Sequence, residues 1–147
     1  MIVIDANVAA KWLLPEAGSE AAVALQEGPE QLVAPDLIRL EVAGAITRRV
    51  RSEKESERLS PEDALARCAK WFRLLDQATV ISLISEGELI ERAIKLSVDI
   101  KHNLHDCLYL AAAKGLDAPL ITADKPFQER AVRFYKRISL LRGCEAN

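Results

Sequence analysis

The sequence predicts an α/β protein: a three-layer α/β/α sandwich with a central, mainly parallel sheet of four to five strands. Short apolar runs alternate along the chain with longer stretches of helical spacing, a pattern typical of right-handed βαβ units. No internal repeat, low-complexity tract or linker interrupts the sequence, so residues 1–147 are expected to form one domain. Half of the residues are hydrophobic, which is enough to bury a sizeable core.

The elements expected in the first part of the chain follow from its apolar runs and its helix breakers. The opening run MIVID is apolar up to its last residue, as in a strand that is buried on both faces. A proline at position 35 suits the first turn of a helix. The predicted elements are a strand at 1–5, helices at 8–15 and 18–27, a strand at 32–35, and a long helix that starts near 35 and becomes basic at 48–51.

Capping signals define the helices expected in the second part. Ser60 stands before a proline and suits a helix start. Ser85 and Glu88 have the spacing of a capping box, and Asn103 stands at the same spacing before Asp106. The predicted elements are helices at 61–75, 86–98, 103–115 and 126–134, and strands at 79–84, 119–122 and 138–141.

Composition excludes several classes of protein. The net charge of -2 argues against a protein that coats nucleic acid by electrostatics. No segment has the roughly 20 apolar residues that span a bilayer, and the N-terminus lacks a basic signal region, so a cytoplasmic protein without membrane contact is expected. The three cysteines have neither CxxC nor zinc-finger spacing, and Cys107 is predicted to be a buried thiol.

Four carboxylates are the strongest functional signal. Asp5 ends the first predicted strand and Asp124 follows the fourth, while Glu41 and Asp106 lie early in two predicted helices. Ligands of open parallel sheets bind beyond the carboxyl ends of the strands. All four carboxylates are therefore expected to share one edge of the sheet.

Each acid also has a purely structural interpretation. Asp106 suits the first turn of a helix through the helix dipole, Asp124 suits a helix cap, and Glu41 suits a solvated helix surface. Asp5 is harder to explain in this way, because a carboxylate at the end of a buried strand costs several kcal/mol unless it is paired or metal-bound. The structural interpretation of all four together is the weaker one.

A hard cation would resolve the mutual repulsion of these acids. Burial and like charges raise carboxylate pKa values as a coupled set. Mg²⁺ prefers oxygen ligands and keeps several waters, so a few carboxylates and a substrate phosphate suffice to bind it. The sequence implies one such metal, and a second only when substrate is present.

At these residues the sequence resembles the PIN domain, and specifically the VapC-like ribonuclease toxins of type II toxin–antitoxin systems. The likeness covers the whole chain. It rests on the N-terminal IDAN, the glutamate of RLEV, the segment HDCLYLAAA and the segment LITADKPF. Together, in this order and spacing, these segments are specific.

The resemblance implies a catalytic and metal-binding set and a reaction. The set is Asp5, Glu41, Asp106 and Asp124. The reaction is Mg²⁺- or Mn²⁺-dependent endoribonuclease cleavage that leaves 5′-phosphate and 3′-hydroxyl ends. Asn7 and Thr122 would support the acids through hydrogen bonds to a metal-bound water or to a carboxylate. Asn7 is equally suited to cap the first helix, and Thr122 to be an ordinary strand residue.

Basic residues and histidines near these acids leave two interpretations open. The first is contact with RNA phosphates by Lys11, Arg39, Arg48 and Arg49. The second is a solvated helix end, which suits the basic run at 48–51 equally well. His105 invites a general-base role through its position next to Asp106, although a surface or capping histidine is the usual case. His102 is the less promising histidine.

The resemblance also implies partners. VapC-like toxins usually form homodimers and are held inactive by an antitoxin protein that places a basic residue in the acidic groove, and they meet DNA only through that antitoxin. The apolar run 12–14 is either core or a surface for a partner. Trp71 and Phe72 are expected in the core.

Three other functions are compatible with parts of this pattern. A housekeeping PIN-domain nuclease without an antitoxin would share the site, and genes next to it would distinguish the two. A catalytically inactive PIN-type module that binds RNA or protein is disfavoured because all four acids are present. A receiver-type phosphoacceptor domain is rejected, because the first strand ends in the single acid Asp5, followed by Ala6 and Asn7.

Overall fold

The computed structural model describes residues 1–76 and 80–145. Its centre is one five-stranded sheet in which every neighbouring pair of strands is parallel, in the order β3-β2-β1-β4-β5. The strands are β1 (Ile2–Ile4), β2 (Leu32–Pro35), β3 (Ile81–Ile84), β4 (Leu120–Thr122) and β5 (Ile138–Leu140). This confirms the predicted α/β class with a parallel sheet. Residue 79, the predicted start of the third strand, lies outside the described residues.

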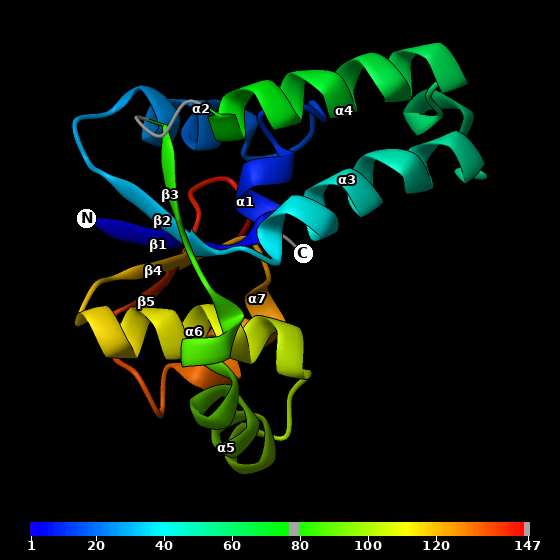
Figure 1. Cartoon of the computed structure of the whole chain (residues 1–147). Coiled ribbons are helices and arrows are strands. Elements are labelled where there is room, and N and C mark those ends of the chain that lie inside the picture. The colour runs from blue at the N-terminus through cyan, green and yellow to red at the C-terminus, as the bar shows by residue number, and fades with distance from the viewer. Residues whose placement is uncertain (77–79, 146–147) are drawn as a thin grey trace.

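Helices cover both faces of the sheet (Figure 1). One face carries α1 (Ala6–Ala10), α2 (Ser19–Glu27), α3 (Ile38–Arg48) and α4 (Pro61–Asp76). The other carries α5 (Ile90–Ile100), α6 (Leu104–Leu116) and α7 (Lys125–Ala131). Short 3-10 turns occupy Arg49–Arg51, Glu55–Glu57 and Glu86–Glu88. The three predicted layers are therefore present.

The order of the strands creates the switch point at which ligands of such sheets bind. The chain moves outward from β1 to β2 and β3, and then returns to the other side of β1 as β4. Val3 of β1 pairs with Val33 of β2 and with Leu120 of β4. A crevice beyond the carboxyl ends of β1 and β4 follows from this reversal. Asp5 follows β1 directly, and Asp124 lies two residues beyond the end of β4.

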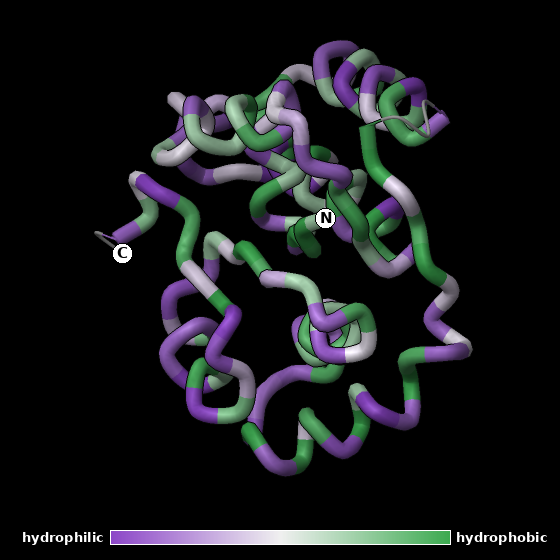
Figure 2. Tube along the Cα trace, turned by 90° about the vertical axis from the view of Figure 1, so that its left-hand side faces the viewer, coloured by the Kyte–Doolittle hydropathy of each residue, from purple (hydrophilic) through white to green (hydrophobic). Residues whose placement is uncertain are grey.

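The core lies in the sheet and in α6. All residues from Cys107 to Ala113 are buried, because α6 packs between the sheet and α5. This confirms the predicted buried thiol of Cys107. Figure 2 shows hydrophobic residues along the central strands, and a mixture of hydrophobic and hydrophilic residues along the outer helices. No helix in the described residues is long and apolar enough to cross a bilayer.

Three helix starts differ from the prediction. The helix predicted at 8–15 is α1, which begins at Ala6 because Asp5 caps it, and which ends at Ala10. Pro35 does not open α3 but ends β2, where it pairs with Ile84, and α3 begins only at Ile38. A proline is tolerated at this strand end because the following backbone N–H, that of Asp36, continues the pairing to the carbonyl of Ile84. Ser85 makes no capping hydrogen bond, since a 3-10 turn follows it and α5 begins at Ile90.

The aromatic residues show which side of each helix faces the core. Trp12 is buried, its indole N–H donates to the carbonyl of Ala22 (2.8 Å), and its ring lies 6.3 Å from that of Trp71. The run 12–14 is therefore core and not a partner surface. Trp71 is fully buried as predicted, but Phe72 is 45% exposed. The prediction for Phe72 was wrong because adjacent residues of a helix point in different directions.

Candidate metal centre

Asp5 anchors the site at the end of the central strand. It caps α1 by accepting a hydrogen bond from the backbone N–H of Val8 (2.8 Å), and its other oxygen accepts one from the Thr122 hydroxyl (2.5 Å). Only 2% of Asp5 is exposed. Burial, together with the nearby charges of Asp106 and Asp124, raises the pKa of Asp5 to about 7, although these two hydrogen bonds act in the opposite direction.

Thr122 links the two strand-end acids. Its buried hydroxyl donates to Asp5 and accepts from the backbone N–H of Asp124 (2.9 Å). Asp124 in turn caps α7 by accepting from the backbone N–H of Phe127 (2.8 Å). The supporting role expected of Thr122 therefore has a geometric basis. Asp124 is a helix cap, and this leaves its second oxygen free for another role.

Asp106 lies in the first turn of α6 and is held by two side chains of the preceding loop. One of its oxygens is 2.7 Å from Nε2 of His102 and accepts a hydrogen bond from the Asn103 amide (2.6 Å). Asn103 also caps the helix by accepting from the backbone N–H of Asp106 (2.9 Å), as predicted. Burial raises the pKa of Asp106, whereas His102 and Asn103 act in the opposite direction.

Glu41 faces the other acids from α3. The buried Tyr109 hydroxyl donates to one of its oxygens (2.6 Å), and His105 Nδ1 lies 3.4 Å from the other. Burial raises the pKa of Glu41, the Tyr109 hydrogen bond and His105 lower it, and Asp106 raises it again. The side chain of His105 is 65% exposed, so it lies at the rim of the site.

These residues surround a cavity of about 310 Å³. Asp5, Glu41 and Asp106 all line it, together with Arg48 from the end of α3. Asp124 is not among the lining residues, but ligand atoms of Asp106, Asp124 and His102 lie within 4.8 Å of one another. The structure therefore brings all four predicted acids into one connected cluster, with Asp106 as the shared member.

The donor set and its electrostatics fit a divalent cation. The pKa values of Asp5, Glu41 and Asp106 are all raised, by burial first and by neighbouring carboxylates in addition. Buried carboxylates of this kind favour any ligand that carries compensating positive charge. Oxygen donors dominate the cluster, as hard cations such as Mg²⁺ and Mn²⁺ prefer.

The remaining predicted residues occupy different environments. Asn7 lines the cavity and is exposed, but Asp5, not Asn7, caps α1. Arg48 also lines the cavity.

Lys11 is buried against Glu16 (2.6 Å), and Arg49 pairs with Glu16 and Glu57, so neither presents a free cation to a ligand. Arg39 pairs with Asp36 (2.5 Å).

Three residues of the site were not identified from the sequence. The sequence favours His105 over His102, predicts Asn103 only as the cap of the helix that carries Asp106, and gives Tyr109 no contact with an acid. The signal for Tyr109 was its position in HDCLYLAAA, three residues after Asp106 and therefore on nearly the same helix face. The signal for His102 was its spacing of four from Asp106.

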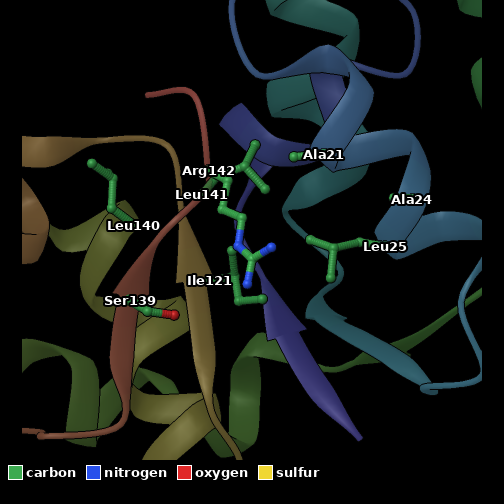
Figure 3. Close-up of a pocket in the computed structure, with 8 residues that line it drawn as sticks. All are labelled: Ala21, Ala24, Leu25, Ile121, Ser139, Leu140, Leu141 and Arg142. Atoms are coloured by element: carbon green, nitrogen blue, oxygen red, sulfur yellow. The ribbon is translucent and has the colours of Figure 1, made fainter. Parts of the chain in front are cut away.

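A second cavity, of about 500 Å³, has a different chemistry (Figure 3). It lies between α2 and the β4–β5 side of the sheet, and side chains such as Leu25, Ile121 and Leu141 make its walls apolar. Arg142 is its one charged lining residue. Because no carboxylate lines it, this cavity is separate from the metal centre.

Fold and site together define a class: a parallel α/β domain with a carboxylate centre at the switch point of its sheet. Residues 2–133 match the family model of the PIN domain. The chain belongs to the PIN-domain family, whose members are nucleases.

Solved structures agree on the fold. A chain of a toxin–antitoxin complex from Klebsiella pneumoniae superposes with a TM-score of 0.66 at 18% identity, covering 95% of this chain and 96% of that one. VapC20 of Mycobacterium tuberculosis, a toxin that cleaves the sarcin-ricin loop, superposes with a TM-score of 0.63 at 17% identity, covering 88% and 94%. A search of curated sequences returns no significant match.

Proposed function

We propose that this PIN-domain protein is a metal-dependent endoribonuclease and the toxin of a toxin–antitoxin pair. The observation that carries the proposal is the cavity lined by Asp5, Glu41 and Asp106, with Asp124 beside Asp106. One buried and two partly buried carboxylates with raised pKa values are costly for a purely structural protein. Their cost is explained if they hold Mg²⁺ or Mn²⁺. The toxin assignment is supported by the likeness to solved toxin structures.

The chain's own residues would prepare the site in three ways. The four acids would hold the cation, which supplies Lewis-acid activation of the phosphodiester and of water when bound. Thr122 and Tyr109 keep Asp5 and Glu41 in fixed orientations through hydrogen bonds. Asn7, exposed at the rim, offers an amide to the attacking water or to the substrate. No side chain is required as a nucleophile.

Arg48 is the basic residue best placed to meet RNA. It lines the cavity, is exposed, and makes no ion pair within the described residues. An arginine in this position would pair with a phosphate next to the scissile bond. His105, also at the rim, would contact the same strand. We assign the RNA surface to these residues and not to Lys11 or Arg49.

The partners follow from the same assignment. A protein antitoxin would place a cationic side chain against the acids and so block the site. A homodimer in the cytoplasm, with DNA contacted only through the antitoxin, completes the proposal. A short open reading frame directly upstream of the gene would support the antitoxin.

Growth on induction tests the toxin assignment. Expression of the wild-type chain without other proteins is expected to arrest bacterial growth, while Asp5→Asn and Asp106→Asn relieve the arrest. Asp63→Asn is the matched control, because Asp63 is an exposed acid of α4 outside the cavity. Arrest that persists in Asp5→Asn at equal protein level would contradict the proposal.

A further inference from the structure

His102 is the unexpected member of the acid cluster. Within residues 1–76 and 80–145, one set of three potential metal ligands has its ligand atoms within 4.8 Å of one another, and it consists of His102, Asp106 and Asp124. Asp5 and Glu41 are not members of this set. Asp106 therefore belongs both to the cavity, whose carboxylates are those of Asp5, Glu41 and Asp106, and to a group that adds the imidazole of His102 to Asp106 and Asp124.

The imidazole ring is held in place from several directions. It stacks on the fully buried ring of Phe127, with centroids 4.9 Å apart and planes at 22°. Ser97 fixes the backbone of His102 through two hydrogen bonds. The Ser97 hydroxyl donates to the carbonyl of His102 (2.6 Å), and the backbone N–H of His102 donates to the carbonyl of Ser97 (3.2 Å). The side chain is 13% exposed. Packing and hydrogen bonds of this kind are typical of side chains that a functional site holds in one fixed orientation.

Phe127 couples the two outer members of the set. Its ring positions His102, and its backbone N–H holds Asp124 through the helix cap. Phe127 therefore contacts both the imidazole of His102 and the carboxylate of Asp124, and contributes to the distance between them. If His102 served only to hold Asp106 through their hydrogen bond, there would be no need for Phe127 to hold Asp124 as well.

We propose that His102 is a nitrogen ligand of the metal centre and makes the Asp106–Asp124 side of the cluster selective for Mn²⁺ over Mg²⁺. The inference deepens the proposed function, because it concerns the cation that the nuclease would use. Imidazole suits transition metals, whereas Mg²⁺ is bound through oxygen and water. The side of the centre lined by Asp5 and Glu41 would accept either metal.

The test measures metal binding directly on the metal-free, tag-free chain. Titration calorimetry gives the Mn²⁺ and Mg²⁺ affinities of the wild type, His102→Gln and His102→Ala. Both variants are expected to lose more Mn²⁺ affinity than the roughly 10- to 100-fold that loss of an outer-shell partner costs, and Mg²⁺ affinity is expected to change much less. His102→Gln matters because its amide still donates to Asp106, so it keeps the orientation of that acid while removing the imidazole.

Electron spin-echo spectroscopy of bound Mn²⁺ supplies a readout that is independent of activity. The chain has two histidines, so the assignment needs only two variants. Imidazole nitrogen modulation is expected in the wild type and in His105→Gln, and is expected to be absent in His102→Gln. His105 is the matched control because it lies near Glu41 and outside the set of three.

Three outcomes would overturn the inference. The first is no nitrogen modulation in the wild type. The second is an unchanged Mn²⁺ affinity in both variants. The third is an equal loss of both metals in His102→Ala that His102→Gln restores, which would make His102 only a positioning residue for Asp106. A chain that binds Mn²⁺ through His102 but cleaves no RNA would contradict the proposed function and leave this inference standing.

Discussion

At the scale of single residues, Asp5 combines near-complete burial with two hydrogen bonds that favour its charged form. Burial outweighs them and raises its pKa from 3.8 to about 7. Between these two values the folded protein binds more protons than the unfolded chain. The contribution of Asp5 to the free energy of unfolding is therefore complete at low pH and is lost as the pH rises toward about 7.

The first prediction concerns this loss of stability as the pH rises. In EDTA, Asp5→Asn is expected to be more stable than the wild type at pH 7.5 by roughly 2–4 kcal/mol, from about 1.4 kcal/mol per pKa unit. The difference should shrink toward pH 4, and excess Mn²⁺ should stabilise the wild type far more than the variant. Urea denaturation at both pH values measures it. A variant that is no more stable than the wild type at pH 7.5 would contradict the burial argument.

Tyr109 gives a second prediction at this scale. Tyr109→Phe removes the hydroxyl that fixes Glu41 and is expected to lower RNA cleavage by about tenfold, as loss of an orienting partner of a metal ligand does. Tyr135→Phe is the control, because within residues 1–76 and 80–145 its hydroxyl bonds the backbone carbonyls of Ala113 and Ala118 and no acid. The control should lose about 1 kcal/mol of stability and keep its cleavage rate. Equal cleavage by both variants would remove Tyr109 from the site.

At the scale of elements, the start of α6 has both a structural and a chemical role. Asn103 caps the helix and donates to Asp106. Asn103→Ala is expected to cost about 1 kcal/mol of stability and, in addition, to weaken Mn²⁺ binding measured by calorimetry. Ser60→Ala removes the equivalent cap of α4, far from the acids in sequence, and should cost similar stability with unchanged metal affinity. If both variants bind Mn²⁺ equally, Asn103 acts only as a cap.

At the end of α3, the adjacent residues Arg48 and Arg49 point to different surroundings and are expected to have different roles. Arg48→Gln is expected to raise the KM for RNA several-fold and to reduce its salt dependence, because Arg48 faces the cavity. Arg49→Gln is expected to leave KM unchanged and to lower stability instead, since Arg49 bridges Glu16 and Glu57. Steady-state cleavage at two salt concentrations and thermal unfolding distinguish the two. A larger rise in KM for Arg49→Gln would reverse this assignment.

The elements also show what local patterns predict. Apolar runs placed all five strands, because strands of a parallel sheet between two layers of helices are largely apolar. This holds even for the edge strands β3 and β5, which are only partly buried. Pro35 and Ser85 misled the prediction of helix starts, since both have strong helix-start preferences that the sheet pairing and a 3-10 turn overrode. Phe72 was placed in the core by its chemistry, although the helix turns it outward.

At the scale of the whole molecule, the carboxylate cluster was predictable because strand ends of a parallel sheet converge by topology. The burial of Lys11 was not predictable, because it depends on an ion pair with Glu16 in the following turn. The position of His102 was not predictable from the sequence either. It depends on stacking against Phe127, which reaches the site from α7, and no local pattern records that contact.

The central claim is that the four acids form a metal-dependent ribonuclease centre. The most direct test follows cleavage of a structured RNA by the purified chain in Mg²⁺, in Mn²⁺ and in EDTA, with Asp5→Asn and Asp63→Asn alongside. We expect cleavage with either metal by the wild type and by Asp63→Asn, and cleavage reduced by at least about 100-fold in EDTA and in Asp5→Asn. Cleavage that persists in EDTA or in Asp5→Asn, or no cleavage by the wild type with either metal, would contradict the account.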